Sequence, residues 1–96
     1  MNIIKNVNGE ILTVAINGRL DTSSAPDFDT FMNENLTNVS KLILDFKELE
    51  YISSAGLRVL LAVQKKMKGE MKLTNVCELV MEVFEMTGFA DILVIE

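Results

Sequence analysis

KLILDFKELEYISSAGLRVLL, residues 41–61, contains in succession the features of a strand, a loop and the first turns of a helix. The short apolar run at residues 42–44 is typical of a strand that is buried on both faces. After the loop, apolar residues recur at spacings of three and four, which predicts a helix over residues 54–68 that stops before Gly69. The side chains expected to face the sheet from this helix are Leu57, Leu60, Val63 and Met67.

Ser53 and Ser54 stand just before the periodic part of this helix. A serine there can cap the helix, because its side-chain oxygen accepts a hydrogen bond from an unpaired N–H group. A helix N-terminus also favours negative charge, so the same place can hold a phosphate. The two serines alone leave both interpretations open.

The residues before this stretch predict a hairpin and a helix. Residues 2–7 and 11–16 have strand character, and Asn8-Gly9 between them is a strong hairpin signal. Asn17-Gly18 indicates a further turn, and Ser24 is the candidate N-cap of a helix that has Pro26 in its first turn. The apolar stripe expected on that helix consists of Phe28, Phe31, Met32 and Leu36.

The residues after this stretch predict a strand at 71–75, a helix at 76–86 that stops before Gly88, and a last strand at 92–95. The order is therefore β-β-α-β-α-β-α-β. Helices that alternate with strands imply crossover units. We expect one α/β domain over residues 1–96, in which helices pack against a mostly parallel central sheet with an N-terminal antiparallel hairpin.

Composition excludes several classes of function. The net charge of −5 argues against binding of nucleic acid, and no apolar run is long enough to span a bilayer, so a cytoplasmic protein is the expectation. Without histidine, and with Cys77 as the only cysteine, neither a zinc site nor a Ser-His-Asp triad can be built, and we expect no metal or cofactor. Asp45, Glu48 and Glu50 alternate in a loop and are expected to face solvent, so we expect no enzyme.

Three motifs in order resemble those of the STAS domain, and within it those of the small bacterial anti-sigma-factor antagonists. Residues 18–21, Gly-Arg-Leu-Asp, resemble the family's Gly-x-Leu-Asp turn. Residues 44–46 and 51–57 resemble its strand and phosphorylation loop, and residues 84–89 resemble its Phe-x-x-Ser/Thr-Gly-Leu segment. The resemblance spans nearly the whole chain.

The family's loop commonly reads apolar-Asp-Ser-Ser/Thr-Gly-Leu, with the serine after the aspartate as phosphoacceptor. Aligned on Gly56 and Leu57, Ser53 takes the aspartate's place and Ser54 takes the acceptor's place. The resemblance therefore implies that Ser54 is phosphorylated, with Ser53 as a second, weaker candidate. Asp21 matches a family aspartate that lies beside this loop.

The resemblance implies a partner switch with two kinds of partner. The unmodified antagonist binds an anti-sigma factor that is a serine kinase of the GHKL type, and so frees a sigma factor. The kinase phosphorylates the antagonist, and a metal-dependent Ser/Thr phosphatase restores it. The residues expected at the partner surface are Asp21, Ser53, Ser54, Gly56, Leu57, Arg58 and Leu61.

A second hypothesis is a STAS-like scaffolding or ligand-sensing module that is never phosphorylated. Ser53 in place of the usual aspartate favours it. The outward pair of Arg58 and Leu61 is compatible with both, since it is either plain surface or the centre of a docking patch.

Overall fold

The computed structural model describes all residues from Met1 to Glu96, and its sheet is organised around β2 (Ile11–Leu20). The hairpin partner β1 (Asn2–Asn8) pairs antiparallel with β2. On its other side β2 has two parallel partners, β3 (Lys41–Asp45) along its first half and β4 (Leu49–Ile52) along its last residues. The fifth strand, β5 (Glu70–Thr74), pairs parallel with β3. The predicted mixed α/β fold with an N-terminal hairpin is confirmed.

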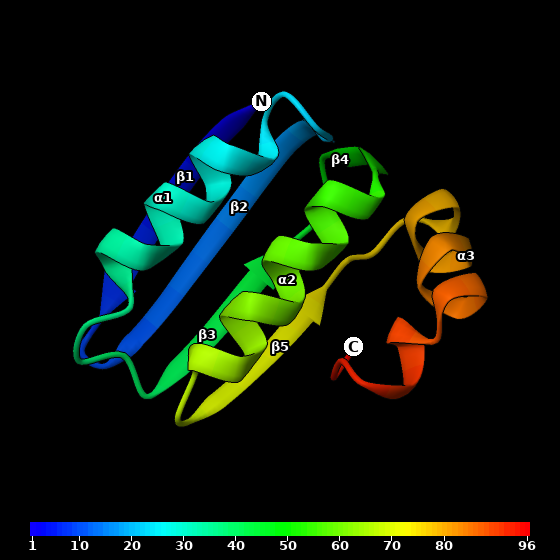
Figure 1. The fold of residues 1–96 in the computed structure, drawn as a ribbon. Helices are drawn as coiled ribbons and strands as arrows, with labels where there is room; N and C mark the ends of the chain where they lie inside the picture. The colour runs from blue at the N-terminus through cyan, green and yellow to red at the C-terminus, as the bar shows by residue number, and fades with distance from the viewer.

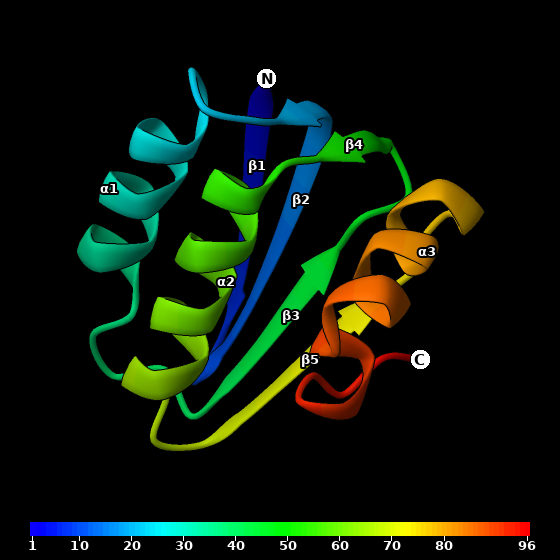
Figure 2. The same cartoon turned by 45° about the vertical axis from the view of Figure 1, so that its right-hand side comes forward.

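Two helices, α1 (Ala25–Asn35) and α2 (Ser54–Lys66), lie side by side on one face of the sheet (Figures 1 and 2). The third, α3 (Glu78–Thr87), stands apart from α1 at the side where β4 and β5 lie. Alternate residues of the strands point toward the helices, because side chains alternate between the two faces of a strand. Together they form one core of 19 buried apolar residues, which includes Leu12, Val14, Leu42, Leu44, Phe46, Leu60 and Phe84.

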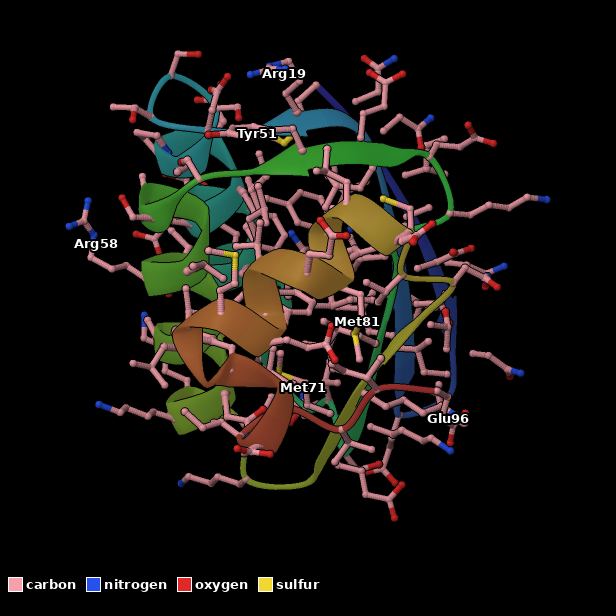
Figure 3. All side chains as sticks on the ribbon, turned by 90° about the vertical axis from the view of Figure 1, so that its right-hand side faces the viewer. Arg19, Tyr51, Arg58, Met71, Met81 and Glu96 are labelled. Carbon is pink, nitrogen blue, oxygen red and sulfur yellow. The ribbon has the colours of Figure 1, made fainter.

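Only one face of β3 is covered, so the predicted burial on both faces is wrong. Leu42 and Leu44 are fully buried beneath the helices, whereas Ile43 is half-buried on the opposite face. There Ile43 lies between Thr13 of β2 and Lys72 of β5. No helix covers this second face (Figure 3), which explains why polar side chains alternate with apolar ones along the sheet.

The predicted turn at Asn17-Gly18 is also wrong, because β2 continues to Leu20. Gly18 has a φ of 100°, and the pairing register between β2 and β4 shifts between Gly18 and Arg19. Such a bulge bends a strand, and glycine adopts the positive φ without steric cost. The bend lets the end of β2 pair with β4, a four-residue strand that the sequence pattern did not reveal.

The predicted last strand at 92–95 is replaced by a 3₁₀ turn, η1 (Phe89–Asp91), and a single parallel bridge between Leu73 and Ile95. Gly88 ends α3 in the left-handed conformation, as its position predicted. The chain then uses Phe89–Asp91 to turn back toward the sheet, so only its last residues reach β5.

Candidate functional site

The candidate site is built where β2 and β4 end side by side. Leu20 and Ile52 are paired in register, and the N–H group of Ser53 donates to the carbonyl oxygen of Leu20 at 2.9 Å. Parallel strands end at the same edge of a sheet. The residues that follow each strand, Asp21 and Ser54 among them, therefore emerge at one end of the molecule.

Gly56 allows α2 to begin directly above this edge. A Cβ atom on Gly56 would lie 2.9 Å from the carbonyl oxygen of Leu20 and 2.8 Å from Cγ1 of Ile52. Real Cβ atoms do not approach backbone oxygen so closely, and any larger residue would lift the helix from the strands. The position of Ser54 thus depends on a glycine two residues later.

Ser53 is the N-cap residue of α2, yet its side chain does not cap the helix. Its Oγ is enclosed by the protein and has no hydrogen-bond partner. A buried hydroxyl without a partner is unfavourable by about 1–3 kcal/mol.

Ser54 has the opposite environment. It is exposed and is the first residue of α2. Because Ser53 provides no side-chain cap, the N–H groups of Ser54, Ala55 and Gly56 have no acceptor within the chain. These N–H groups and the helix dipole favour a negative group at this position.

Asp21 organises the loop between β2 and α1. Its Oδ1 accepts from Ser23 Oγ at 2.8 Å, from the Ser23 N–H at 3.0 Å and from the Ser24 N–H at 3.2 Å. These bonds, the one from the Ser23 hydroxyl first, lower the pKa of Asp21 from 3.8 to about 2, although partial desolvation opposes the shift. Asp21 is therefore a fixed negative charge at neutral pH.

Ser24 ties the same loop to β2 and does not cap α1 through its side chain, although it is the N-cap residue as predicted. Its hydroxyl donates to the carbonyl oxygen of Arg19 at 2.7 Å and accepts from the N–H of Asp21 at 2.9 Å. The loop that carries Asp21 is thus held from both sides.

Arg19 and Tyr51 form a second feature of this end, a contact that no sequence motif predicts (Figure 3). The guanidinium of Arg19 lies over the ring of Tyr51, 4.3 Å from its centroid, and its Nε is 3.6 Å from Asp21 Oδ2. A cation–π contact at an exposed site contributes about 0.5–1 kcal/mol, whereas an exposed ion pair is screened by solvent and adds little. The pairing of β2 with β4 places the two residues opposite each other, so the unrecognised strand β4 explains why they were missed.

A groove of about 490 Å³ runs between α1 and α2 beside Ser54. Its lining is small and mostly apolar, with one acidic and one basic side chain at its rims. The lining residues are Thr22, Ala25, Pro26, Asp29, Ala55, Arg58, Val59 and Ala62. Of these lining residues, only Arg58 was expected at the site. The groove itself could not be predicted, because it depends on how the two helices pack and leaves no pattern in the sequence of either helix.

The predicted site residues on α2 fall into two groups. Arg58 is exposed and Leu61 is half-buried, and their spacing places both on the stripe of α2 that also contains Ser54. Gly56 and Leu57 are buried beneath this stripe. Gly56 and Leu57 therefore hold the helix on the sheet and present no side chain to a partner.

A second groove of about 490 Å³ lies near the other end of α2, between Gln64, Met71 and Val94. The charged side chains along it are paired, Lys41 with Glu70 at 3.8 Å and Lys72 with Glu96 at 3.0 Å. No cluster of three or more histidine, cysteine or acidic side chains is arranged to hold a metal ion. No helix has the length and apolar character that crossing a membrane requires.

Two sequence relatives are described as anti-sigma factor antagonists. The chain is 30% identical over 100 residues to the anti-sigma-B factor antagonist of Bacillus subtilis, a match that covers 97% of this chain and 88% of the relative. It is 47% identical over 55 residues to BtrV of Bordetella bronchiseptica, described as an anti-sigma factor antagonist. That second match covers 54% of this chain and 47% of BtrV, about half the length of each.

Solved structures share the fold. An anti-sigma factor antagonist from Mycobacterium paratuberculosis superposes with a TM-score of 0.89 at 16% identity and covers 98% of this chain and 83% of its own. Unphosphorylated SpoIIAA superposes with a TM-score of 0.85 at 19% identity, covering 99% and 88%, and phosphorylated Bacillus SpoIIAA with 0.75 at 18%, covering 99% and 91%. The sequence profile of the STAS domain matches residues 2–96. The chain therefore belongs to the STAS domain family.

Proposed function

We propose that this chain is an anti-sigma-factor antagonist whose binding is controlled by phosphorylation of Ser54. In its unmodified form it binds an anti-sigma factor that is also a serine kinase of the GHKL type, and so releases a sigma factor in the cytoplasm. Phosphorylation of Ser54 by that kinase ends the complex, and a metal-dependent Ser/Thr phosphatase restores it. The chain acts by binding, as one domain over residues 1–96, and catalyses no reaction itself. Two relatives described as antagonists support this proposal.

The observation that carries the proposal is the contrast between the two neighbouring serines. Ser54 is exposed at the first position of α2, beside N–H groups without acceptors, whereas Ser53 Oγ is enclosed. A kinase that reaches this loop finds one accessible hydroxyl. That hydroxyl is also the one in the acceptor position of the family's motif.

The docking surface of this proposal consists of Asp21, Ser54, Arg58 and Leu61 with the groove between α1 and α2. Ser53 contributes to it through its backbone, which holds the loop to β2. The surface is small and combines apolar groove walls with charged rims, a combination typical of interfaces that form and separate. A phosphate on Ser54 therefore adds negative charge next to the contacts that this docking surface makes with a partner.

The energies favour a block of binding over unfolding. Phosphorylation adds about −1.5 to −2 charges at neutral pH, at the end of the sheet where the ionised Asp21 also emerges. At an exposed helix N-terminus this charge is favourable by about 0.3–1 kcal/mol, so the domain keeps its fold. In a protein interface an uncompensated charge is unfavourable by about 3 kcal/mol or more. The effect on the interface is the larger of the two.

The two SpoIIAA structures support the same conclusion. An unphosphorylated SpoIIAA and a phosphorylated Bacillus SpoIIAA both superpose on this chain over 99% of its length, with TM-scores of 0.85 and 0.75. A fold that is common to both forms is the arrangement expected when a phosphate acts at the surface.

The proposal is tested by affinity capture from the native host with four forms of the chain. Wild type and Ser54→Ala are expected to retain one anti-sigma factor, and Ser54→Asp is expected to lose it. Ser53→Ala is the matched control, since it removes the neighbouring hydroxyl, and it is expected to bind as wild type. Equal recovery of the same partner by wild type and Ser54→Asp would argue against the switch.

Intact-mass analysis of the chain isolated from its host completes the test. A phosphoryl group localised to Ser54 is the expected result. A chain that binds its partner but is never phosphorylated under any growth condition would instead support the second candidate, a constitutive scaffolding or ligand-sensing STAS module. The observation that favours this candidate is Ser53, which leaves the loop without the carboxylate that commonly precedes the acceptor.

A further inference from the structure

Arg58 stands one helical turn after Ser54 on the exposed stripe of α2. Both residues are exposed, and residues four apart on a helix have Cβ atoms about 5–6 Å from each other. Arg58 has no ion pair and no aromatic contact in the chain. Its guanidinium is therefore free and within reach of a group attached to Ser54 Oγ.

The chain's other arginine is not available in the same way. Arg19 is held over Tyr51, 4.3 Å from the ring centroid, and its Nε is 3.6 Å from Asp21. Figure 3 shows Arg58 extending outward from α2, clear of the Arg19–Tyr51 pair. Arg58 is thus the one unengaged guanidinium of the docking surface.

A phosphate on Ser54 matches Arg58 in chemistry and in direction. The planar guanidinium offers parallel N–H groups that bind two phosphate oxygens at once. An anion four residues before a cation is also the favourable order on a helix, because the anion then lies near the positive end of the dipole. We propose that Arg58 is the internal counter-ion of phosphorylated Ser54, an inference that rests on the proposed phosphorylation of this residue.

The other charged groups near Arg58 leave room for this pairing. Across the groove, α1 presents Asp29, which makes no ion pair with Arg58. The loop before α1 presents Asp21, whose carboxylate is bound by Ser23, Ser24 and Arg19. The remaining groove walls carry no charge. A phosphate therefore meets one free cation, and it meets it on its own helix.

The pairing changes what phosphorylation does to the docking surface. It adds a negative group, and it also withdraws the only free guanidinium from contact with a partner. Suppose that a carboxylate of the anti-sigma factor binds Arg58 in the unmodified complex. After phosphorylation that carboxylate would lose the guanidinium and would also be repelled by the phosphate on Ser54.

The test uses the full chain with phosphoserine installed at position 54, so that no kinase is needed. The phosphate is titrated by ³¹P NMR, and an ordinary phosphoserine has a second pKa of about 6. A neighbouring guanidinium stabilises the dianion and lowers the midpoint. We expect Arg58→Gln to raise the midpoint by about 0.3 pH units, and this difference to disappear in about 1 M salt, where exposed pairs are screened.

Lys65→Gln is the matched control, since it removes one positive charge from the same stripe of α2. Lys65 lies about 16 Å along the helix axis from Ser54, which is beyond the range of screened interactions. We therefore expect Lys65→Gln to leave the midpoint of the phosphate titration unchanged. Arg58→Lys is expected to restore part of the effect. Equal midpoints for Arg58→Gln and Lys65→Gln would overturn the role of Arg58 and leave the Ser54 switch standing. Absence of phosphate in the host would contradict the switch and leave this titration unaffected.

Discussion

Ser53 and Ser54 show how adjacent residues of one type acquire different chemistry. The first turns its hydroxyl into the protein, where the oxygen has no partner, and the second exposes its hydroxyl at the start of α2. Helix-start position alone permitted a cap or a phosphate site for either serine. The structure shows that Ser53 makes no side-chain cap and leaves Ser54 as the accessible hydroxyl, while phosphorylation of Ser54 stays a prediction.

Removing the enclosed hydroxyl is expected to leave stability unchanged or to raise it. In Ser53→Ala no hydrogen bond is lost and a buried unpaired group disappears, so the free energy of unfolding rises by up to about 1 kcal/mol. Ser24→Ala is the contrast, because its hydroxyl donates to Arg19 and accepts from Asp21, and its loss is unfavourable by about 1 kcal/mol. Urea denaturation of both variants measures the difference. A Ser53→Ala variant that is less stable than Ser24→Ala would contradict the assignment.

Asp21 predicts a specific dependence of stability on acid. Its pKa is lowered from 3.8 to about 2 by hydrogen bonds that require the ionised form, the one from the Ser23 hydroxyl first. The folded state therefore binds this proton less readily than the unfolded state. The stabilisation of the folded state by ionised Asp21 is complete above about pH 4 and is lost as the pH falls toward 2.

Asp21→Asn is expected to remove this part of the pH dependence. The measurement is the urea midpoint between pH 5 and 2 for wild type and variant, in which the two curves converge as the pH falls. If the curves of wild type and Asp21→Asn stayed parallel over this range, Asp21 would have the same pKa in the folded and the unfolded state, which would contradict this prediction.

At the scale of elements, the site depends on how closely α2 approaches the end of β2. This close approach requires glycine at position 56, because a Cβ atom there would lie 2.9 Å from the carbonyl oxygen of Leu20. Helix propensity alone favours alanine over glycine by about 1 kcal/mol. Packing and propensity therefore make opposite predictions for the same substitution.

Gly56→Ala is expected to destabilise the protein by about 1–3 kcal/mol in spite of its higher helix propensity, because the helix must shift away from the strands. Ala55→Gly, one residue earlier in the same turn, isolates the propensity effect and is unfavourable by about 1 kcal/mol. Thermal or urea unfolding compares the two. A stabilised Gly56→Ala variant would show that α2 does not need this close approach.

The elements that the sequence predicts correctly are those with a clear periodic pattern or a compact apolar run. β1, β3, β5 and all three helices have observed bounds within about two residues of those expected, whereas β2 runs four residues past its expected end at residue 16. β4 was missed because four residues after a charged turn show no distinguishable period. Asn17-Gly18 predicts a turn where the structure has a bulge, because a glycine with positive φ is found in both.

At the scale of the whole molecule, the sheet brings the ends of β2 and β4 together and so assembles the site from segments about thirty residues apart in the chain. The sequence motifs predict Asp21 and Ser54 at the site because each follows the end of a strand, and the helical period predicts Arg58 there because it lies on the outward face of α2. The Arg19–Tyr51 contact and the groove between α1 and α2 could not be predicted, since they arise only when elements pack.

The central claim is that phosphorylated Ser54 blocks the docking surface while the domain stays folded. The most direct measurement is the Kd of the captured anti-sigma factor for the chain with Ser54 unmodified and with phosphoserine installed at that position. A penalty of about 3 kcal/mol predicts binding weaker by about 100-fold for the phosphorylated chain, with the same unfolding temperature within a few degrees. Equal affinity of the two forms, or loss of binding through unfolding of the phosphorylated chain, would contradict the account.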